Sequence, residues 1–475
     1  MKIANEVIER GKRNWSRLPK VLGLSRKPEV APDERQFSAA DVKPLREQIE
    51  ACIAQRGGQV SSSQQAARLA DQYRGWGAAE RRQFLELLLE DFDINETQVR
   101  EALQAASSVT GEELSNACQA LRKALVPDRA ELLRQWTLLP AGVKFLVDLR
   151  RDVIGLMKED PRFKPLSTDL KLLLASLFNV GILQLQSISW KSPAALLEKL
   201  IAYEAVHEIK SWEDLKNRLD VDRRCFAFFH PNMPEEPLIF IEVALNKGVA
   251  DNVLRLLDTS VPALNPHEAD TAVFFSISNT QQGLAGIPFG GFLIKQVVDS
   301  LRHDVPNIRK FITLSPIPGF RKWVEGEEGQ SVLKTLDPKK LKAAAPGLDA
   351  AESFAAYLKG LDWEHPDTIG EDFRLLLRGL CARYLTEAKR GNGPAALDPV
   401  AHFHLNNGAR VEQINWGANL TERGLRESFG LMVNYRYKLE RIEKHHEDYL
   451  HKGMVYTSSQ VKALRTKSVA ARTRG

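Results

Sequence analysis

The chain has 475 residues, of which 43% are apolar and 27% are charged, and its formal net charge is +5. This composition is typical of a globular protein, and a chain of this length is expected to form two or three domains. The basic residues are spread along the chain and no apolar run is long enough to cross a bilayer, which argues against a nucleic-acid-binding face and a membrane span.

Residues 1–37 carry a basic excess but lack the apolar segment of a secretory signal, and we expect a flexible N-terminus there. A transit-like segment is the alternative. Glu6, Glu9 and Glu29 argue against it, because such segments are poor in acidic residues. The C-terminal Thr-Arg-Gly is not the peroxisomal address Ser-Lys-Leu.

The four cysteines lie far apart in the chain and form no Cys-x-x-Cys pair: Cys52, Cys118, Cys225 and Cys381. Zinc binding and thioredoxin-type chemistry are therefore not expected. The pattern suits a reducing compartment, and we expect the protein in the cytoplasm.

Residues 38–179 show apolar side chains at helical spacing throughout, for example Phe84, Leu85, Leu88, Leu89 and Phe92. Glycines and prolines interrupt this pattern at intervals, and no convincing strand occurs. We predict a helical bundle of about six to eight helices, given typical helix lengths. The bundle contains no evident catalytic constellation, so its expected role is oligomerisation or bracing.

From about Trp190 the pattern becomes mixed. Helices are expected between strand-like runs at Cys225–Phe229, Leu238–Leu245, Ala272–Ile277, Phe311–Ile317 and Val411–Trp416. Residues 332–390 read as a helical insertion, expected to be a hairpin. The predicted fold class is α+β, with a helical bundle followed by a mixed α/β catalytic domain at 180–457 that carries helical insertions. Residues 458–475 are expected to be a flexible tail.

A glycine-rich loop separates two of these strands. The order is strand 272–277, loop 278–291, helix 292–302 and strand 311–317, with glycines at 283, 286, 290 and 291. Glycines let backbone N–H groups approach a phosphate, and the helix N-terminus adds partial positive charge. An ordinary β–α turn is the alternative interpretation. The dinucleotide and P-loop glycine patterns are absent, and the arrangement instead resembles the pyrophosphate loop of acetyl-CoA-dependent N-acetyltransferases, the GNAT fold.

Two stiff segments carry a hydroxyl and an imidazole. Ser315 ends an apolar run and is followed by Pro316 and Pro318, which restrict the backbone. His402 and His404 follow Asp398-Pro399 in what reads as a rigid, polar turn. The pair suggests catalysis, while a proline-terminated strand and an ordinary loop histidine remain the alternative.

Other candidate constellations are weaker. On a strand His402 and His404 would face the same side, as metal ligands do, but no third ligand at suitable spacing is evident and no metal is expected. The run His445-His446-Glu447-Asp448 lies in a charged helical stretch, and a solvated face is the preferred interpretation. Ser315 lies in no Gly-x-Ser-x-Gly elbow and is not expected to be a hydrolase nucleophile.

Several long motifs in order resemble the malonyl-CoA decarboxylase family, from about Trp190 to Tyr437. They are Thr280-Gln-Gln-Gly-Leu-Ala-Gly286, Ser315-Pro-Ile-Pro-Gly-Phe320, Phe403-His-Leu-x-Asn-Gly408, Ile414-Asn-Trp416 and Gly430-Leu-Met-x-Asn-Tyr-Arg-Tyr437. The resemblance implies a GNAT-like catalytic half, decarboxylation of malonyl-CoA to acetyl-CoA and CO2, a homotetramer, and a place in malonate or fatty acid metabolism. Thr280 and Pro288 depart from the patterns of the acetyltransferases and of some decarboxylases.

The resemblance also assigns roles to residues. It implies that Ser315 orients the malonyl group and that His404 protonates the enolate, with Ser276 and Tyr437 as supports near the acyl group. The CoA loop would comprise Ala285, Gly286, Ile287, Pro288, Phe289, Gly290 and Gly291. No cofactor is expected, because the thioester carbonyl is itself an electron sink. A CoA-dependent acyltransferase and a non-catalytic CoA-binding scaffold are the alternative functions.

Overall fold

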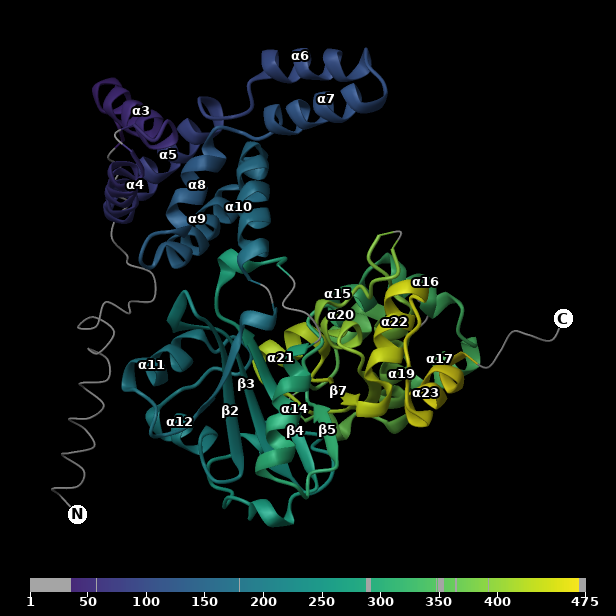
Figure 1. The fold of residues 1–475 in the computed structure, drawn as a ribbon. Coiled ribbons are helices and arrows are strands. Elements are labelled where there is room, and N and C mark those ends of the chain that lie inside the picture. Colours follow the sequence, from purple (N-terminus) through teal and green to yellow (C-terminus); the bar gives the residue numbers. More distant parts are fainter. Residues whose placement is uncertain are drawn as a thin grey trace. The chain divides into compact units, whose positions relative to one another are not determined.

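The computed structural model describes residues 36–469, apart from positions 57, 179, 288–291, 347, 349–353, 364 and 392. The chain divides into two compact units, one ending at Leu173 and the other beginning at Leu174 (Figure 1). The predicted flexible segment 1–37 lies almost wholly outside the described residues. No helix in the described part of the chain is both long and apolar enough to cross a membrane.

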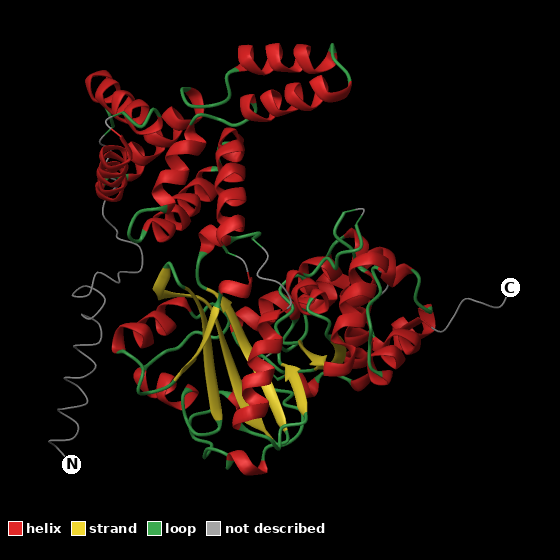
Figure 2. Cartoon of the chain, in the orientation of Figure 1, coloured by secondary structure: helices red, strands yellow, loops and turns green. Residues whose placement is uncertain are grey.

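The first unit is helical, as predicted, and Figure 2 shows no strand in it. Eight α-helices begin among its described residues, which confirms the expected number: α3 (Ala39–Ile53), α4 (Gly58–Gly75), α5 (Ala78–Glu90), α6 (Glu96–Ser107), α7 (Gly111–Ala124), α8 (Arg129–Thr137), α9 (Gly142–Leu156) and α10 (Lys164–Leu177). A short 3-10 turn, η1 (Pro161–Phe163), precedes α10.

Aromatic side chains form the core of the first unit. Trp136 on α8 is fully buried and packs edge-to-face on Phe145 with ring centroids 4.9 Å apart. Tyr73 meets both Phe84 and Phe145 in similar edge contacts. The Trp136 indole N–H donates to the carbonyl of Ala66 at 2.9 Å, so the buried ring keeps no unsatisfied polar atom.

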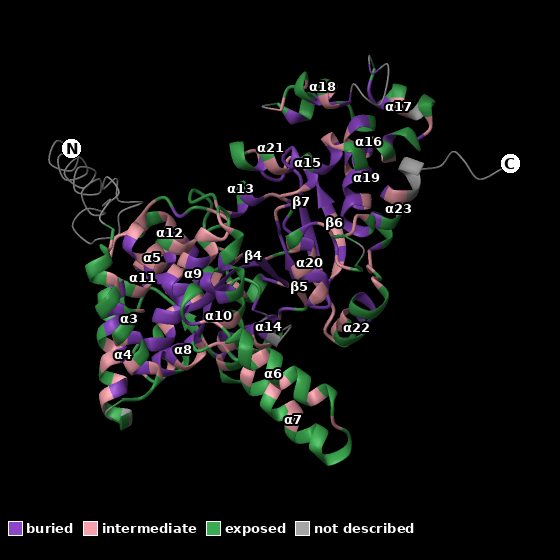
Figure 3. Cartoon of the chain, turned by 90° about the horizontal axis from the view of Figure 1, so that it is seen from above, coloured by how far each residue is buried: buried purple, intermediate pink, exposed green. Residues whose placement is uncertain are grey.

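The hairpin of α6 and α7 is different from the rest of this unit. The two helices pack on each other, yet neither contains a buried residue, and Figure 3 shows both in the colours of intermediate and exposed residues. Leu103 is 56% exposed and Leu114 is 38% exposed. The hairpin therefore presents apolar side chains that the described residues of the chain leave uncovered.

The second unit is built on one seven-stranded sheet in the order β1-β2-β3-β4-β5-β7-β6. Neighbouring strands are antiparallel except for the central pair β4 and β5, which is parallel. The strands are β1 (Gln184–Ile188), β2 (Arg223–His230), β3 (Met233–Asn246), β4 (Thr271–Asn279), β5 (Lys310–Thr313), β6 (Arg410–Asn415) and β7 (Met432–Tyr437). Together with the helical first unit, this mixed sheet confirms the predicted α+β class.

Helices precede, cover and follow the sheet. Those outside the β5–β6 connection are α11 (Ala194–Tyr203), α12 (Trp212–Arg218), α13 (Val253–Leu256), α14 (Phe292–Asp304), α21 (Glu422–Ser428), α22 (Ile442–Lys452) and α23 (Ser459–Val469). Short 3-10 turns lie at η2 (Val180–Ile182), η3 (Pro266–Glu268), η4 (Gln282–Leu284), η6 (Pro366–Thr368) and η7 (Leu439–Arg441). Helices α11 and α12 pack on one face of β1–β3 through a core that contains Leu197, Leu200, Leu215, Ala227 and Phe240.

The predicted strand–loop–helix–strand arrangement is present as β4, a loop, α14 and β5. A register shift between Glu242 and Val243 of β3 leaves Phe275 of β4 without a cross-strand partner, as in a β-bulge. Beyond this point β4 continues toward the glycine-rich loop. The parallel β4–β5 pair, joined through the loop and α14, is the arrangement that the resemblance to acetyltransferases implied.

Three expectations about strands need correction. The run 311–317 is not one strand: β5 ends at Thr313, and Ser315 makes a single isolated bridge to Val433. The ladder cannot continue because Pro316 has no N–H to donate. Strands β1 and β7 were not among the predicted strands, and β7 separates β5 from β6.

Two helical expectations also change. The connection between β5 and β6 contains more than a hairpin: α15 (Phe320–Glu325), α16 (Glu327–Lys334), α17 (Pro338–Ala344), α18 (Phe354–Lys359), α19 (Glu371–Glu387) and α20 (Pro399–Asn406). The predicted flexible tail 458–475 is wrong for residues 459–469, which form α23. Its side chains Val461 and Leu464 are buried, and it packs on α19 and β6.

Candidate active site

Ser315 lies just beyond the end of β5 and is held by backbone hydrogen bonds in both directions. Its N–H donates to the carbonyl of Val433 at 2.8 Å, and the Val433 N–H donates to the Ser315 carbonyl at 3.0 Å. The side chain is 5% exposed. This bridge and Pro316 fix the backbone on both sides of the hydroxyl, as the sequence predicted.

His404 lies on helix α20 and not in a turn, which corrects the expectation for residues 398–404. Asp398 is the N-cap: its Oδ1 accepts from the backbone N–H groups of Val400 and Ala401 at 3.0 and 2.9 Å. Pro399 occupies the first helical position, where its missing N–H is harmless. His404 follows in the last turn of the helix and is buried.

The two predicted catalytic side chains meet across 89 residues of sequence. Ser315 Oγ lies 3.0 Å from His404 Nε2, and His404 Nδ1 lies 2.8 Å from the Tyr437 hydroxyl. The Ser315 hydroxyl also donates to Thr313 Oγ1 at 2.8 Å. The structure therefore brings Ser315, His404 and Tyr437 together as one buried hydrogen-bonded group.

Burial sets the protonation of this group. It lowers the pKa of His404 to about 3 and raises the pKa of Tyr437 well above its ordinary value, because a charged form loses its hydration there. The imidazole is thus neutral and the phenol is protonated at neutral pH. The ring of Tyr435 stacks on the imidazole with centroids 4.5 Å apart and restricts its orientation.

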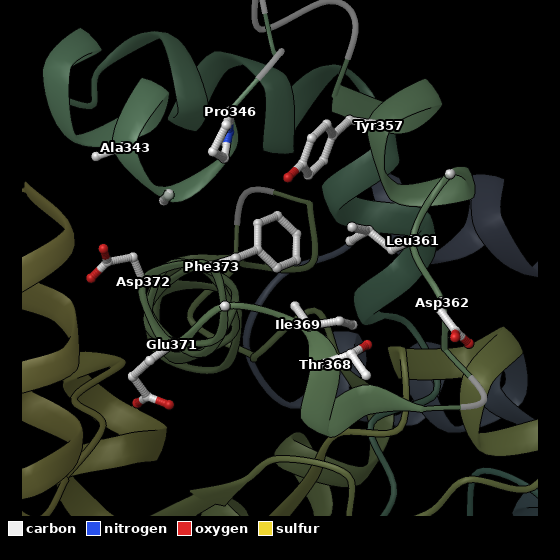
Figure 4. A pocket seen from close by; sticks show the side chains of 13 residues that line it. Ala343, Pro346, Tyr357, Leu361, Asp362, Thr368, Ile369, Glu371, Asp372 and Phe373 are labelled. Atoms are coloured by element: carbon white, nitrogen blue, oxygen red, sulfur yellow. The ribbon is translucent and has the colours of Figure 1, made fainter.

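A pocket of about 210 Å³ opens onto Ser315 and His404. Its other lining residues are mostly apolar: Val206, Phe274, Phe275, Ile277, Asn279, Pro316, Pro399, Val400 and Phe403. A larger pocket of about 390 Å³ lies among α17, α18 and α19, where Tyr357, Ile369 and Phe373 line it (Figure 4). That pocket contains none of the predicted site residues, so we assign the chemistry to the smaller one.

Comparison with known proteins shows the family of the chain. The family model described as "Malonyl-CoA decarboxylase C-terminal domain" matches residues 181–474, and the model of the N-terminal domain matches residues 92–178. The chain belongs to the malonyl-CoA decarboxylase family. The mitochondrial malonyl-CoA decarboxylase of Rattus norvegicus is 37% identical over 406 residues, which is 82% of each chain.

Solved structures of family members show the same fold. Malonyl-CoA decarboxylase from Rhodopseudomonas palustris superposes with a TM-score of 0.80 at 38% identity, and the enzyme from Agrobacterium vitis with 0.78 at 39%. Each match covers 89% of this chain and 99% of the other. The family resemblance in the sequence motifs is therefore confirmed.

Ser276 on β4 hydrogen-bonds to Glu204 rather than to Ser315 or His404. Its hydroxyl donates to the carboxylate of Glu204, with Oγ 2.8 and 2.9 Å from the two oxygens. Ser278 donates to the same carboxylate at 3.2 Å, and the backbone N–H of Val206 donates to it at 2.8 Å. The described contacts thus give Ser276 a role in fastening the segment after α11, which contributes Val206 to the pocket wall.

Only part of the predicted CoA loop belongs to the described residues. Ala285 and Gly286 are exposed and Ile287 is buried, while Pro288, Phe289, Gly290 and Gly291 lie outside the described residues. Gly286 has a φ of 73°, a conformation that favours glycine. The loop leads into α14, which begins at Phe292.

The two histidines of α20 do not share a ligand. His402 Nδ1 lies 2.8 Å from the Tyr449 hydroxyl, whereas His404 faces Ser315 and Tyr437. Residues two apart on a helix point in different directions. Among the residues that the structure describes, no group of three or more His, Cys, Asp or Glu side chains is arranged to hold a metal ion.

The solvated-face interpretation of the run 445–448 is wrong for two of its members. His445 and Asp448 are buried, and the His445 ring stacks on Tyr456 with centroids 4.1 Å apart. Lys452 and the Tyr456 hydroxyl hydrogen-bond to Asp448, each at 2.6 Å. These contacts join α22 to the segment before α23 and are structural.

Sequence reasoning missed three polar residues around the site. Asp398 is fully buried, and besides capping α20 it accepts from the Tyr384 hydroxyl at 3.3 Å and the Gly319 N–H at 3.4 Å. It thereby ties the helix of His404 to the loop after Ser315. Asp398-Pro399 is a helix-start signal, and in the structure it begins α20. Thr313 and Glu204 carried no comparable local signal.

Proposed function

We propose that this protein decarboxylates malonyl-CoA to acetyl-CoA and CO2, with Ser315 and His404 as the catalytic residues. The observation that carries the residue assignment is the 3.0 Å contact between Ser315 Oγ and His404 Nε2 at the wall of a largely apolar pocket. Membership of the malonyl-CoA decarboxylase family through both domain models supports the reaction.

The reaction requires one bond to break and one to form. The C–C bond to the carboxylate breaks, CO2 leaves, and the electron pair passes into the thioester as an enolate. His404 then donates the Nε2 proton to the carbon, and water restores that proton after acetyl-CoA leaves. When substrate binds, the Ser315 hydroxyl turns from Thr313 Oγ1 and donates to the malonyl carboxylate or the thioester oxygen, while Oγ still accepts from His404 Nε2; a donor aimed at a developing oxyanion is typically worth about 3–4 kcal/mol.

The apolar lining of the pocket favours the loss of CO2. A malonyl carboxylate that enters between Val400, Phe403 and Phe274 exchanges water for apolar side chains. The charge of the carboxylate moves to the enolate oxygen as neutral CO2 forms, so the pocket destabilises the carboxylate more than the apolar product.

We propose that no metal or organic cofactor takes part, because the thioester carbonyl accepts the electron pair. The test is to incubate the purified protein with malonyl-CoA alone and to measure CO2 and acetyl-CoA. An acyltransferase would need an acceptor, and a CoA-binding scaffold would release neither product. If a chelator abolished the activity and zinc restored it, the cofactor-independent reaction would be wrong.

For the CoA moiety, we propose that the loop 285–291 and the N-terminus of α14 receive the pyrophosphate. The support is the left-handed backbone of Gly286 and the position of the loop immediately before a helix. N–H groups at a helix N-terminus lack intrahelical partners and attract anions.

We also propose that the protein is a homo-oligomer, a tetramer by resemblance, and that the α6–α7 hairpin takes part in the contact with a second copy. The hairpin supports this because it buries no residue of its own and exposes Leu103 and Leu114. Light scattering of the full chain at micromolar concentration tests it. Leu103→Glu with Leu114→Glu should lower the mass, and a monomeric wild type would refute the proposal.

The proposed compartment is the cytoplasm, and the proposed pathway is malonate use or fatty acid metabolism. All four cysteines are free thiols in the structure, as expected in a reducing compartment, whereas the rat relative is named mitochondrial. Cell fractionation with an antibody against the protein decides the compartment.

A further inference from the structure

Thr313 is the last residue of β5, and its side chain is fully buried beside the catalytic pair. Its Oγ1 accepts two hydrogen bonds, one from the Ser315 hydroxyl at 2.8 Å and one from the Tyr435 N–H at 3.0 Å. Tyr435 is the residue whose ring stacks on His404. Thr313 therefore contacts both the hydroxyl of the pair and the backbone of the residue that orients the imidazole.

The contact with Thr313 decides which atom is the donor in the two hydrogen bonds of His404, to Ser315 and to Tyr437. A serine hydroxyl has one proton, and here that proton points to Thr313 Oγ1. Ser315 Oγ must then accept a proton in its 3.0 Å contact with His404, so Nε2 carries the hydrogen. In a neutral imidazole the other nitrogen is an acceptor, and Nδ1 accepts from the Tyr437 hydroxyl at 2.8 Å.

We propose that Thr313 is a positioning residue that fixes the tautomer of His404, with the proton on Nε2, on the side of Ser315 and the pocket. Its consequence for the rate rests on the proposed function. In the protonation step the Nε2–H bond breaks as the enolate electron pair forms the new C–H bond. The N–H electron pair stays on the ring as an imidazolate, which the Tyr437 hydroxyl stabilises through its hydrogen bond to Nδ1 until water returns a proton to Nε2. The neutral imidazole is the acid, in agreement with the lowered pKa of His404.

Removal of the Thr313 oxygen should reverse this arrangement. The Ser315 hydroxyl would turn to the nearest remaining acceptor, His404 Nε2, and the imidazole proton would move to Nδ1, where it faces Tyr437. The acid proton would then be on the wrong side of the ring. Thr313→Val keeps the shape of the side chain and deletes only the hydroxyl, whereas Thr313→Ser keeps the hydroxyl.

The experiment is ¹⁵N spectroscopy of histidine-labelled full-length protein without substrate, with the His404 signals assigned by their loss in His404→Asn. We expect a protonated Nε2 and a bare Nδ1 in the wild type, and the reverse in Thr313→Val. The kcat of Thr313→Val should fall by about 10²-fold, as for loss of a correctly placed general acid, with little change in KM. Thr313→Ser should restore both the tautomer and the rate.

Thr386→Val is the matched control, since Thr386 is also buried but its hydroxyl donates to the carbonyl of Ala382 within α19, away from the hydrogen-bonded group of Ser315 and His404. It should leave the tautomer unchanged. An Nδ1–H tautomer in the wild type overturns the proposal, even if Thr313→Val fails to fold, and so does a Thr313→Val protein with wild-type tautomer. Absence of CO2 release by the wild type would instead refute the proposed function, because the tautomer is measured in the resting protein.

Discussion

The two units differ in what lies at their centres. At the centre of the first unit the Trp136 ring contacts both Phe84 and Phe145, and a buried polar pair, Ser62 and Gln135, is joined by one hydrogen bond. The second unit also has an apolar core, but around the site it buries several polar side chains. Those of Thr313, Ser315, His404 and Tyr437 form one hydrogen-bonded chain. Asp398 accepts from the Tyr384 hydroxyl, and Asn434 donates to the backbone carbonyl of Thr313.

This difference teaches which changes should affect stability and which should affect rate. Burial of an apolar ring stabilises a fold, whereas burial of a hydroxyl or imidazole costs free energy unless each polar atom finds a partner. The hydrogen bonds around His404 offset the free-energy cost of burying these polar groups but add little stability beyond that. We therefore expect substitutions in the first core to lower stability and substitutions at the site to lower kcat.

The largest effect should come from the catalytic pair. Ser315→Ala and His404→Asn should each lower kcat by about 10²-fold or more, because an oxyanion donor or a general acid acts in the transition state. Both variants should fold, since α20 remains capped by Asp398. Steady-state kinetics with malonyl-CoA, together with circular dichroism, measures this.

His402→Asn is the control for His404. It lies on the same helix and hydrogen-bonds to Tyr449 rather than to Ser315, so its effect on kcat should be mild. A folded His404→Asn protein with nearly wild-type turnover would remove His404 from the mechanism and with it the contrast between the two units.

The opposite pattern should follow from Trp136→Ala. This change empties the centre of the first core and removes the indole hydrogen bond to the Ala66 carbonyl, and large-to-small changes of this type typically cost about 3–5 kcal/mol. Urea denaturation should report the loss, while kcat per folded molecule stays close to the wild-type value. A loss of kcat in folded Trp136→Ala protein would show that the core of the first unit affects the reaction rate as well as stability.

The buried imidazole should also be visible in the pH dependence of stability. The unfolded chain protonates His404 below about pH 6.5, while burial lowers the folded pKa to about 3. The unfolded state thus binds one more proton between these values, and stability is lost as the pH falls through this window, by about 1.4 kcal/mol per pH unit. Above it, this contribution is fully present.

Urea denaturation between pH 4.5 and 6 measures how the free energy of unfolding changes with pH. His404→Asn should reduce this slope by the contribution of about one proton, which is about 1.4 kcal/mol per pH unit. Burial lowers the pKa of His207 to about 3 as well. Both His207 and His404 should therefore contribute to the slope measured for the wild type. An unchanged slope in His404→Asn would mean that the imidazole is already protonated in the folded protein.

The smallest of these effects concerns the phosphate loop. Gly286→Val should raise the KM for malonyl-CoA about tenfold, or about 1.4 kcal/mol of binding, because a β-branched residue is strained at a φ of 73°. A malonyl-pantetheine thioester, which lacks the nucleotide, should be much less affected. Equal loss with both substrates in a folded variant would favour an ordinary β–α turn.

Much of the fold could be predicted from local signals. Helical spacing marked the first unit, and the run of strand, glycine-rich loop, helix and strand appeared as β4, loop, α14 and β5. Helix α20 was mistaken for a turn although Asp398-Pro399 is a helix start. Strand β7 belongs to a motif that was recognised in the sequence but not predicted as a strand. Nearly all its residues are buried, Asn434 included, so burial does not follow the alternation of apolar and polar residues that marks a half-buried strand.

The candidate site could also be predicted only in part. Ser315, His404 and Tyr437 were identified by family motifs, and the structure brings them within hydrogen-bond distance. The resemblance implied that Ser276 lies near the acyl group, and its hydroxyl hydrogen-bonds to Glu204. No pattern in the sequence connects residues 204 and 276, because the end of α11 and strand β4 come together only in the folded chain.

By itself, the sequence determined the features that depend on a few neighbouring residues. The prolines after Ser315 ended the strand, and glycine at position 286 allowed a left-handed turn. The tertiary structure alone decided which side chains meet: Thr313 with Ser315, Asp398 with Gly319, and α23 with α19. The physical reason is that backbone dihedral preferences are local, whereas the partner of a buried polar group is chosen by everything that excludes water from it.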